Sequence, residues 1–233
     1  MGANLIEAEN LGRRYGRRWA LADVSFKVRS GSVVMVAGRN GSGKSTLFRL
    51  LSTAIRPDRG KATIGGFELV REREDIRRTT ALLSHYSYLY ESLTARENLS
   101  VAADHLGKPR SVVMPLLERV TLAQRADDPV STFSAGMRKR VSFARVLLQE
   151  PTLALLDEPY GQLDPEGFLL VDEVVRELKA QGTTVMLATH QLERGANLAD
   201  DVIILEAGRV QWTGKAADVL TRERPGKAGG TAW

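Results

Sequence analysis

The stretch that most constrains the fold is Val33 to Leu51, "VVMVAGRNGSGKSTLFRLL". It begins with an apolar run that ends at Gly38, as expected for a strand buried on both faces of a sheet. Beyond the glycine-rich loop, apolar residues recur at the spacing of one helix face: Leu47, Leu50, Leu51 and Ala54. Pro57 ends this pattern. A buried strand, a glycine loop and an amphipathic helix in this order predict one unit of a parallel α/β sheet.

The glycine-rich loop, Gly38 to Thr46, matches the pattern G-x-x-x-x-G-K-[ST]. Glycines let such a loop turn its backbone N–H groups inward around phosphate oxygens, and the following helix N-terminus adds a partial positive charge. The pattern predicts that Lys44 reaches the β- and γ-phosphates of a nucleotide and that Ser45 ligates Mg²⁺. The predicted nucleotide contacts in this loop are Gly38, Asn40, Gly41, Ser42, Gly43, Lys44, Ser45 and Thr46. The alternative is a flexible glycine loop without a ligand.

Two further apolar strands end in chemically useful side chains. "TLALLD" ends at Asp157, which is predicted to hold Mg²⁺ through water, and Glu158 follows, where it can polarise an attacking water. The alternative is a pair of acids that only caps a strand. "TTVMLATH" ends at His190, and strand ends are where phosphates bind in open α/β sheets. His190 is therefore predicted to contact a γ-phosphate, the alternative being a hydrogen-bonded core histidine.

The rest of the chain surrounds this core. "LIEAEN" and "ADVSFKV" predict strands near the N-terminus, and "DVIILEAGRV", residues 201–210, predicts one more strand. Residues from about 91 to 150 are mostly helical in pattern, and one helix face there carries Met137, Val141, Ala144 and Leu148. Asp164 and Pro165 predict the start of another helix. Residues 223–233 have little to pack and are predicted to be a flexible tail.

Composition excludes several classes of protein. The 233 residues contain no cysteine, which rules out disulfides, thiolate zinc sites and cysteine nucleophiles. The apolar runs are far shorter than the roughly 20 residues that span a bilayer, and no secretory signal precedes them. The net charge is +5, with arginine clusters at residues 13–18 and 71–78. These clusters indicate either a polyanionic partner or a solvated surface in which acids alternate with arginines.

The phosphate loop and the two acids alone would fit a kinase, a GTPase or a helicase-like motor. "FSAGMRKR", residues 133–140, resembles the signature segment of the ABC ATPases, usually written LSGGQ. The resemblance extends from Leu5 to about Leu220. It implies an α/β P-loop NTPase fold of ABC ATPase architecture. That fold has a RecA-like parallel-sheet core, an N-terminal antiparallel β-subdomain and a helical subdomain inserted at about 91–150, in one domain over 1–222.

The resemblance also implies roles for single residues. Tyr15 matches the aromatic residue that stacks on adenine, Asp157 the acid on the metal side, Glu158 the catalytic base and His190 the switch histidine. The implied catalytic set is Glu158, His190 and Lys44. "YGQLD", Tyr160 to Asp164, falls at the family's D-loop, with Gly161 and Gln162 in place of the commoner Ser-Ala.

In this family two copies pair head to tail, and each nucleotide lies between the phosphate loop of one copy and the signature of the other. The resemblance therefore implies that Ser134, Ala135 and Gly136 contact ATP in trans, in a homodimer or beside a different ATPase subunit. Ala135 replaces the second signature glycine, and Met137 replaces the glutamine and is expected to pack in the core.

"LLSHYSYLYESLT", residues 82–94, holds the largest departure from the family. His85 stands where the family has a glutamine that helps to ligate Mg²⁺. Since Mg²⁺ prefers oxygen ligands, we expect His85 to act through a bound water or the γ-phosphate. Tyr86, Tyr88 and Tyr90 follow in the loop that couples ATP binding to transmembrane partners, and they are predicted to line or flank a docking groove. At least one of them is expected to pack into the helical subdomain.

The sequence thus predicts an ATPase that uses ATP and Mg²⁺ and drives a separate transmembrane permease subunit from the cytoplasmic face of the cell membrane. "LSHYSYLYESLTARENL", "FSAGMRKRVSFARVLL" and "THQLERGANLAD" resemble the haem-exporter branch used in cytochrome c maturation. One alternative is an ATPase of another exporter, for lipids, peptides or drugs. The other is a soluble ABC ATPase acting on nucleic acid or ribosomes. No nucleic-acid partner is expected.

Overall fold

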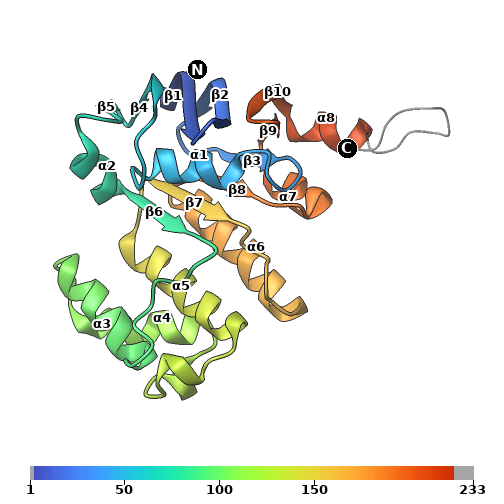
Figure 1. Ribbon diagram of the computed structural model, residues 1–233. Helices are drawn as coiled ribbons and strands as arrows, with labels where there is room; N and C mark the ends of the chain where they lie inside the picture. Colours follow the sequence, from blue (N-terminus) through green and yellow to red (C-terminus); the bar gives the residue numbers. More distant parts are fainter. Residues whose placement is uncertain (1–2, 223–233) are drawn as a thin grey trace.

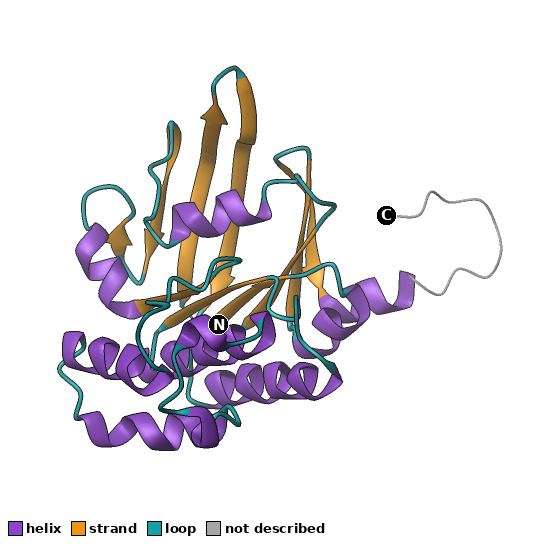
Figure 2. Cartoon of the chain, turned by 60° about the horizontal axis from the view of Figure 1, so that its bottom comes forward, coloured by secondary structure: helices purple, strands orange, loops and turns teal. Residues whose placement is uncertain are grey.

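The computed structural model of the chain describes residues 3–222 (Figure 1). The predicted flexible tail at 223–233 lies outside the described residues. Two sheets and a group of helices make up the described part. In Figure 2 most helices gather at one end of the molecule and the long antiparallel strands stand at the other.

The central sheet carries the strands that the apolar runs predict. Its order is β10-β9-β3-β8-β7-β6. The strands are β3 (Val33–Ala37), β6 (Thr80–Leu83), β7 (Leu153–Asp157), β8 (Thr184–Ala188), β9 (Asp201–Glu206) and β10 (Arg209–Lys215). All neighbouring pairs are parallel except β9 and β10. The predicted parallel core is confirmed, and β3, β7 and β8 are buried at every position.

The prediction of one strand over 201–210 is wrong, because this segment contains a hairpin turn. The chain reverses at Ala207 (φ 46°) and Gly208 (φ 78°), both in the left-handed region that two-residue hairpin turns favour. A side chain at Gly208 would also come within 2.6 Å of the carbonyl oxygen of Ala20. Apolar residues continue on both sides of the turn, so hydrophobicity alone gives no sign of it.

The second sheet is the N-terminal antiparallel β-subdomain. Its order is β2-β1-β4-β5, formed by β1 (Asn4–Tyr15), β2 (Arg18–Arg29), β4 (Arg59–Ile64) and β5 (Phe67–Glu68). Val24, Phe26 and Val28 alternate with exposed residues on β2, as predicted. Strands β1 and β2 are longer than the predicted segments. A tight turn after Tyr15 joins the end of β1 to the start of β2.

Helices cover both faces of the central sheet. They are α1 (Lys44–Leu51), α2 (Arg73–Thr79), α3 (Ala95–His105), α4 (Val113–Arg119), α5 (Ala135–Gln149), α6 (Pro165–Ala180), α7 (Leu192–Leu198) and α8 (Ala216–Arg222). Short 3₁₀ turns lie at 110–112, 123–125 and 130–132. The expectation that Ala54 belongs to the buried face of α1 is wrong: the helix ends at Leu51, Thr53 turns at φ 59° and Ala54 is exposed.

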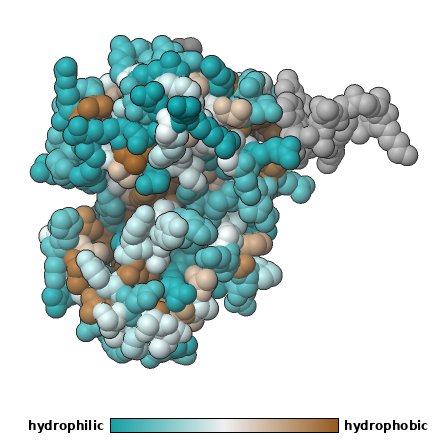
Figure 3. All heavy atoms as spheres, viewed as in Figure 1, coloured by the Kyte–Doolittle hydropathy of each residue, from teal (hydrophilic) through white to brown (hydrophobic). Residues whose placement is uncertain are grey.

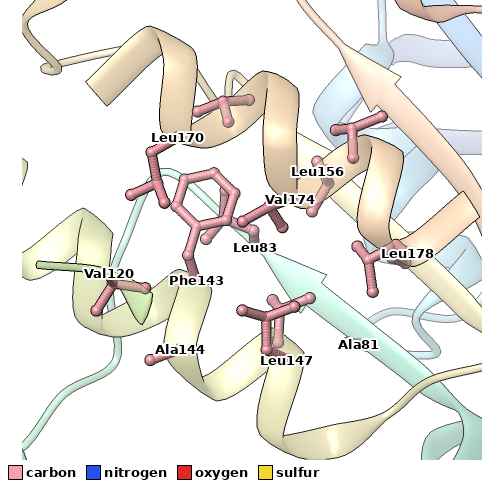
Figure 4. Packing of buried hydrophobic residues seen from close by; sticks show 14 of the residues in the cluster. Ala81, Leu83, Val120, Phe143, Ala144, Leu147, Leu156, Leu170, Val174 and Leu178 are labelled. Carbon is pink, nitrogen blue, oxygen red and sulfur yellow. The ribbon is translucent and has the colours of Figure 1, made fainter. Parts of the chain in front are cut away.

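Two apolar clusters fix the layers. Alternate residues of β3 face opposite sides, so Val34 joins a cluster with α1 and the N-terminal strands, while Met35 joins one with α5, α6 and the helical insertion. In Figure 4, Phe143 of α5 points toward Val174 of α6. Phe143 is fully buried, and burying such a ring contributes about 1.5–3 kcal/mol. The helical insertion is therefore packed onto the sheet, and the start of α5 has a fixed place relative to it.

Candidate active site

The glycine-rich loop joins β3 to α1 at the carboxyl edge of the sheet, as predicted. Its glycines adopt backbone angles that other residues rarely take, with φ of 149° at Gly38, 80° at Gly41 and 111° at Gly43. A side chain on Gly43 would come within 2.7 Å of the Ala20 carbonyl oxygen. The loop is thus held tightly against β2, with its conformation set by glycine.

Lys44 turns back into this loop. The residue is buried, and its Nζ donates hydrogen bonds to the carbonyl oxygens of Gly38 (2.7 Å) and Arg39 (3.3 Å). Ser42 Oγ is buried and has no hydrogen-bond partner among the described residues. Within residues 3–222 the loop therefore contains an ammonium that makes no ion pair and a hydroxyl without a hydrogen-bond partner, a combination suited to an anion.

Asp157 ends β7 and comes together with Ser45, as predicted for the metal site. Burial raises the pKa of Asp157, while a hydrogen bond from Ser45 lowers it, as do the nearby charges of Lys44 and Lys139. Asp157 Oδ1 is buried without a hydrogen-bond partner within the described part of the chain. An unsatisfied carboxylate oxygen beside a serine hydroxyl is a donor set of the kind Mg²⁺ prefers.

Ser45 and Asp157 fit a Mg²⁺ ion that is held jointly by the protein and by the phosphates of a bound substrate. No group of three or more His, Cys, Asp or Glu side chains that could hold a metal occurs within residues 3–222. Mg²⁺ usually keeps several waters and binds through one or two protein oxygens plus substrate phosphates. Ser45 and Asp157 would supply the protein oxygens in such an arrangement.

Glu158 and His190 lie together beside this site. His190 Nδ1 is 2.8 Å from Glu158 Oε2, although β8 ends two residues before the histidine. The His190 side chain is 64% exposed, so the alternative of a core histidine is wrong. Glu158 itself has φ 48°, an uncommon angle for a glutamate, and its N–H donates to the Ala188 carbonyl oxygen at 2.8 Å.

The signature residues lie at the N-terminus of α5, as predicted. Ser134 is the N-cap residue, and its Oγ accepts a hydrogen bond from the Met137 N–H at 3.2 Å. A side chain on Gly136 would come within 3.0 Å of the Gln162 carbonyl oxygen, so the signature packs against the "YGQLD" loop. Met137 packs against the apolar cluster, which confirms its predicted core role.

A groove of about 570 Å³ opens over this helix end. It is lined by Thr121, Leu122, Arg125, Ser134, Ala135, Gly136, Met137, Arg140, Gln162, Leu163 and Asp164. None of these residues belongs to the phosphate loop. Within one chain, the structure therefore does not bring Ser134, Ala135 and Gly136 to Lys44, Ser45 and Asp157.

Tyr15 stands at the end of β1, in the hairpin that packs against the phosphate loop. Its side chain is exposed, and the Arg13 guanidinium lies 5.2 Å from the centre of its ring. The ring is thus held on one side by a cation and is open to solvent, which leaves a surface on which an aromatic base could stack.

His85 lies in the loop after β6. Its ring meets Tyr86 edge to face, with the ring centres 5.4 Å apart. The same loop and the start of α5 enclose a cavity of about 230 Å³, which His85 lines together with Lys139 and Gln162. Ser45 and Asp157 do not line this cavity, so the described residues do not place His85 at the candidate metal site.

The expectation that at least one loop tyrosine packs into the helical subdomain is wrong. Tyr86, Tyr88 and Tyr90 are 70%, 68% and 62% exposed. The loop is held instead by its backbone: Arg145 donates to the Ser87 carbonyl oxygen (2.9 Å) and the Tyr88 carbonyl oxygen (3.3 Å). Leu89 is the side chain that packs against the core.

Buried Asn98 holds the end of this loop. It accepts from the Tyr90 N–H at 2.8 Å and donates to the Tyr90 carbonyl oxygen at 3.0 Å. The three rings therefore project from a backbone that is anchored at both ends.

Sequence analysis did not identify several residues that shape the site. Lys139 donates from Nζ to the Glu158 carbonyl oxygen at 2.9 Å. Tyr160 donates to Asp172 (2.8 Å), which also accepts from Arg194 (2.7 Å). The helical spacing of Lys139 and Phe143 on one buried face of α5 was the available signal for the lysine. Nothing in the sequence marks the contact between Asp172 and Arg194.

Most arginines of the second cluster, residues 71–78, form ion pairs on the surface. Arg71, Arg77 and Arg78 pair with Glu68, Glu74 and Asp75 at 2.9 to 3.5 Å. This pairing favours the solvated-surface interpretation for that cluster. Hydrophilic residues predominate on the face shown in Figure 3. Within residues 3–222 no helix has the length and apolar character needed to cross a membrane.

Comparison with known proteins agrees with this geometry. A family model described as ABC transporter matches residues 21–161. The daunorubicin resistance ATP-binding protein DrrA3 of Streptomyces coeruleorubidus is 40% identical over 97% of this chain and 72% of its own length. The Nod factor export ATP-binding protein I of Ralstonia nicotianae is 34% identical over 94% of this chain and 70% of its own length. The lantibiotic transport ATP-binding protein SrtF of Streptococcus pyogenes is 32% identical over 88% of this chain and 89% of its own length.

Solved structures show the same fold. An ATP-binding subunit of an ABC transporter superposes with a TM-score of 0.85 at 33% identity, covering 94% of this chain and 93% of that one. A dimeric ATP-binding cassette bound to ADP and phosphate superposes with a TM-score of 0.82 at 24% identity, covering 91% of this chain and 98% of that one. The second likeness concerns the fold alone. The phosphate loop, the acids and the signature helix thus lie on a known framework, and the chain belongs to the ATP-hydrolysing ATP-binding subunits of the ABC transporter family.

Proposed function

We propose that this chain powers an exporter of drug-like, lipid-like or peptide molecules through a separate membrane subunit. The relatives support this cargo class, since their names refer to daunorubicin resistance, Nod factor export and lantibiotic transport. Haem export, the first prediction from the sequence, has no support among these relatives. The alternative exporter is the better hypothesis.

The observation that carries the proposal is the separation of the site into two halves. One half consists of Lys44, Ser45 and Asp157, and the other of the groove over the start of α5. Two chains paired head to tail would bring the phosphate loop of one to Ser134, Ala135 and Gly136 of the other. The hydroxyl and the backbone N–H groups of a helix N-terminus suit a phosphate.

In the half that contains Lys44, Ser45 and Asp157, each residue has a distinct role in binding ATP. The N–H groups of the phosphate loop and Lys44 hold the triphosphate of ATP, and Tyr15 stacks on adenine. Ser45 and Asp157 hold Mg²⁺, which when bound neutralises charge on the phosphates. His85, which lines the neighbouring cavity, acts through a bound water and not as a direct metal ligand.

Hydrolysis then depends on Glu158 and His190. Glu158 orients and polarises the attacking water at the γ-phosphate. His190, whose Nδ1 is 2.8 Å from the Glu158 carboxylate, orients Glu158 and contacts the γ-phosphate. Catalysis consists mainly of positioning and charge stabilisation.

The exposed tyrosines of residues 86–90 supply the docking surface for the membrane subunit, so the chain works as a peripheral subunit at the cytoplasmic face. Amphipathic aromatic side chains suit the core of a protein interface. Nucleic acid is a poorer partner for this loop, because residues 84–94 contain Glu91 and no lysine or arginine to neutralise phosphates.

The test is co-purification of a tagged Glu158→Gln chain from detergent-solubilised native membranes in the presence of ATP. We expect turnover to fall about 100-fold or more, with ATP binding retained and a multi-span membrane protein recovered. Recovery should drop when Tyr86 and Tyr88 are also changed to alanine. A partner without bound haem supports the drug, lipid or peptide class, and a haem-containing partner contradicts it. Recovery of nucleoprotein alone contradicts the exporter.

A further inference from the structure

Lys139 is a buried cation without a direct ion pair among residues 3–222. It is 7% exposed. Its one hydrogen bond runs from Nζ to the Glu158 carbonyl oxygen at 2.9 Å. Burial lowers the pKa of Lys139, and the charges of Asp157 and Glu158 oppose that shift. Burying an ammonium without a direct ion pair lowers the stability of the folded chain.

The group that Lys139 holds is strained. Glu158 has φ 48°, a conformation that is unfavourable for a non-glycine residue and persists only where its surroundings enforce it. The surroundings do so on both sides of the residue. The Glu158 N–H donates to Ala188, and its carbonyl oxygen accepts from Lys139 and from the Gly161 N–H at 3.1 Å.

The position of Lys139 in the fold connects three regions. It lies on α5, five residues after Ser134 at the N-terminus of that helix. It also lines the 230 Å³ cavity beneath the loop that carries His85 and Tyr86. From that place its ammonium reaches the backbone of Glu158, whose carboxylate meets His190. A small movement of α5 would therefore act directly on Glu158.

We propose that Lys139 is a positioning residue for ATP hydrolysis, which holds the backbone of Glu158 so that its carboxylate faces the attacking water. This inference rests on the proposed role of Glu158 as the base. Lys139 touches neither the nucleotide nor the water; it acts through the carbonyl oxygen of Glu158. Because its charge is buried and unpaired, it contributes to turnover at the expense of stability.

The test uses the purified full-length chain and measures kcat and KM for ATP hydrolysis together with Tm. Lys139→Met keeps the aliphatic stem and removes the donor. We expect kcat to fall about tenfold or more and KM to change less than about twofold, with Tm unchanged or raised. Lys139→Arg keeps a cationic donor and should recover most of the turnover. Lys108→Met, which breaks a pair between the partly buried Lys108 and the exposed Glu150 (2.7 Å), is the matched control and should keep the wild-type kcat.

A double-mutant cycle with Glu158→Gln decides how Lys139 acts. If it works only through Glu158, Lys139→Met will change the residual rate of Glu158→Gln less than about twofold. A wild-type kcat for Lys139→Met, a rise in KM alone, or additive losses in the cycle would each overturn the inference. If Lys139→Met does not fold, Lys139→Leu, which also lacks a donor, is judged by the same constants.

The same measurements separate this inference from the proposed function. Wild-type turnover in Glu158→Gln would remove Glu158 as the base, and the role of Lys139 would fall with it. An inactive Glu158→Gln beside a fully active Lys139→Met would overturn the role of Lys139 alone.

Discussion

The phosphate loop and the start of α5 both offer hydrogen-bond donors to an anion, but they are built differently. Lys44 and Asp157 in the first half are buried, and Ser42 and Asp157 keep unsatisfied polar atoms there. In the second half, Ser134 is exposed and caps its own helix over an open groove of about 570 Å³. The first half is therefore suited to a small ligand, whereas the second is open enough to meet a larger partner.

This difference has an energetic basis. Buried polar atoms without partners are unfavourable, so the first half gains free energy when a phosphate and its metal arrive. The exposed N-terminus of α5 is already solvated and gains little from a small anion alone. It becomes useful when a second chain carries the bound nucleotide to it.

The sharpest way to break this comparison is complementation between two damaged chains. Lys44→Ala removes the cation of the first half, and Gly136→Asp places a carboxylate in the second half, against Gln162. We expect each chain alone to lose about 100-fold or more in ATP hydrolysis, because charge stabilisation of the phosphates is lost. Mixed dimers regain one intact site, so an equal mixture should reach about a quarter of the wild-type rate.

The control for this mixture uses two changes within the same half. Lys44→Ala mixed with Glu158→Gln leaves no intact site in any dimer, and no rate should return. If the first mixture stays inactive while both chains bind to each other, the two halves do not meet across a dimer.

A second prediction concerns the cost of the buried acid. Burial holds the pKa of Asp157 above the ordinary 3.8. The folded chain therefore binds this proton more tightly than the unfolded chain, and stability falls as pH rises from 3.8 through the raised pKa. At neutral pH the penalty is fully present, so Asp157→Asn should raise Tm by a few degrees.

Thermal unfolding at two pH values checks this sign. The gain in Tm for Asp157→Asn should shrink as the pH is lowered below 3.8, where the acid is protonated in both states. Mg²⁺ and ATP together should stabilise the wild type more than the variant. A variant that is less stable than the wild type at pH 7 would show that Asp157 supports the fold.

The first half was predictable because its parts are contiguous in the sequence. Gly38 to Thr46 form one motif, and Asp157 and Glu158 directly follow a run of buried residues. In such segments local chemistry and hydrophobic pattern agree, so a single stretch fixes both the strand and the residue at its end.

What failed depended on contacts distant in the sequence. The tyrosines of residues 86–90 are exposed because Arg145, 57 residues from Tyr88, holds their backbone. The link from Lys139 to Glu158 spans 19 residues and runs from a side chain to a carbonyl oxygen. Neither contact leaves a pattern in hydropathy or spacing. The residues of the first half could thus be located in the fold from the sequence, while the contacts that support them could not.

The smallest expected effect belongs to Tyr160, which stands between the two halves. It opens the "YGQLD" loop that packs against Gly136, and its buried hydroxyl donates to Asp172 at 2.8 Å. Burial and the neighbouring Asp172 raise the pKa of Tyr160, so the hydroxyl keeps its proton at any ordinary pH. Arg194, which follows the His190 loop, donates to the other oxygen of Asp172 at 2.7 Å.

Tyr160→Phe removes one hydrogen bond and leaves the ring, its edge-to-face contact with Phe168 and the Arg194 pair in place. The change leaves a buried carboxylate oxygen of Asp172 without this hydrogen bond, so the free energy of unfolding should fall by about 1–2 kcal/mol. Urea unfolding measures this as a lower midpoint at unchanged slope. Tyr86→Phe, on an exposed ring, should change it by less than about 0.5 kcal/mol. If the two changes cost the same, water replaces the Tyr160 hydroxyl and the bond to Asp172 adds no net stability.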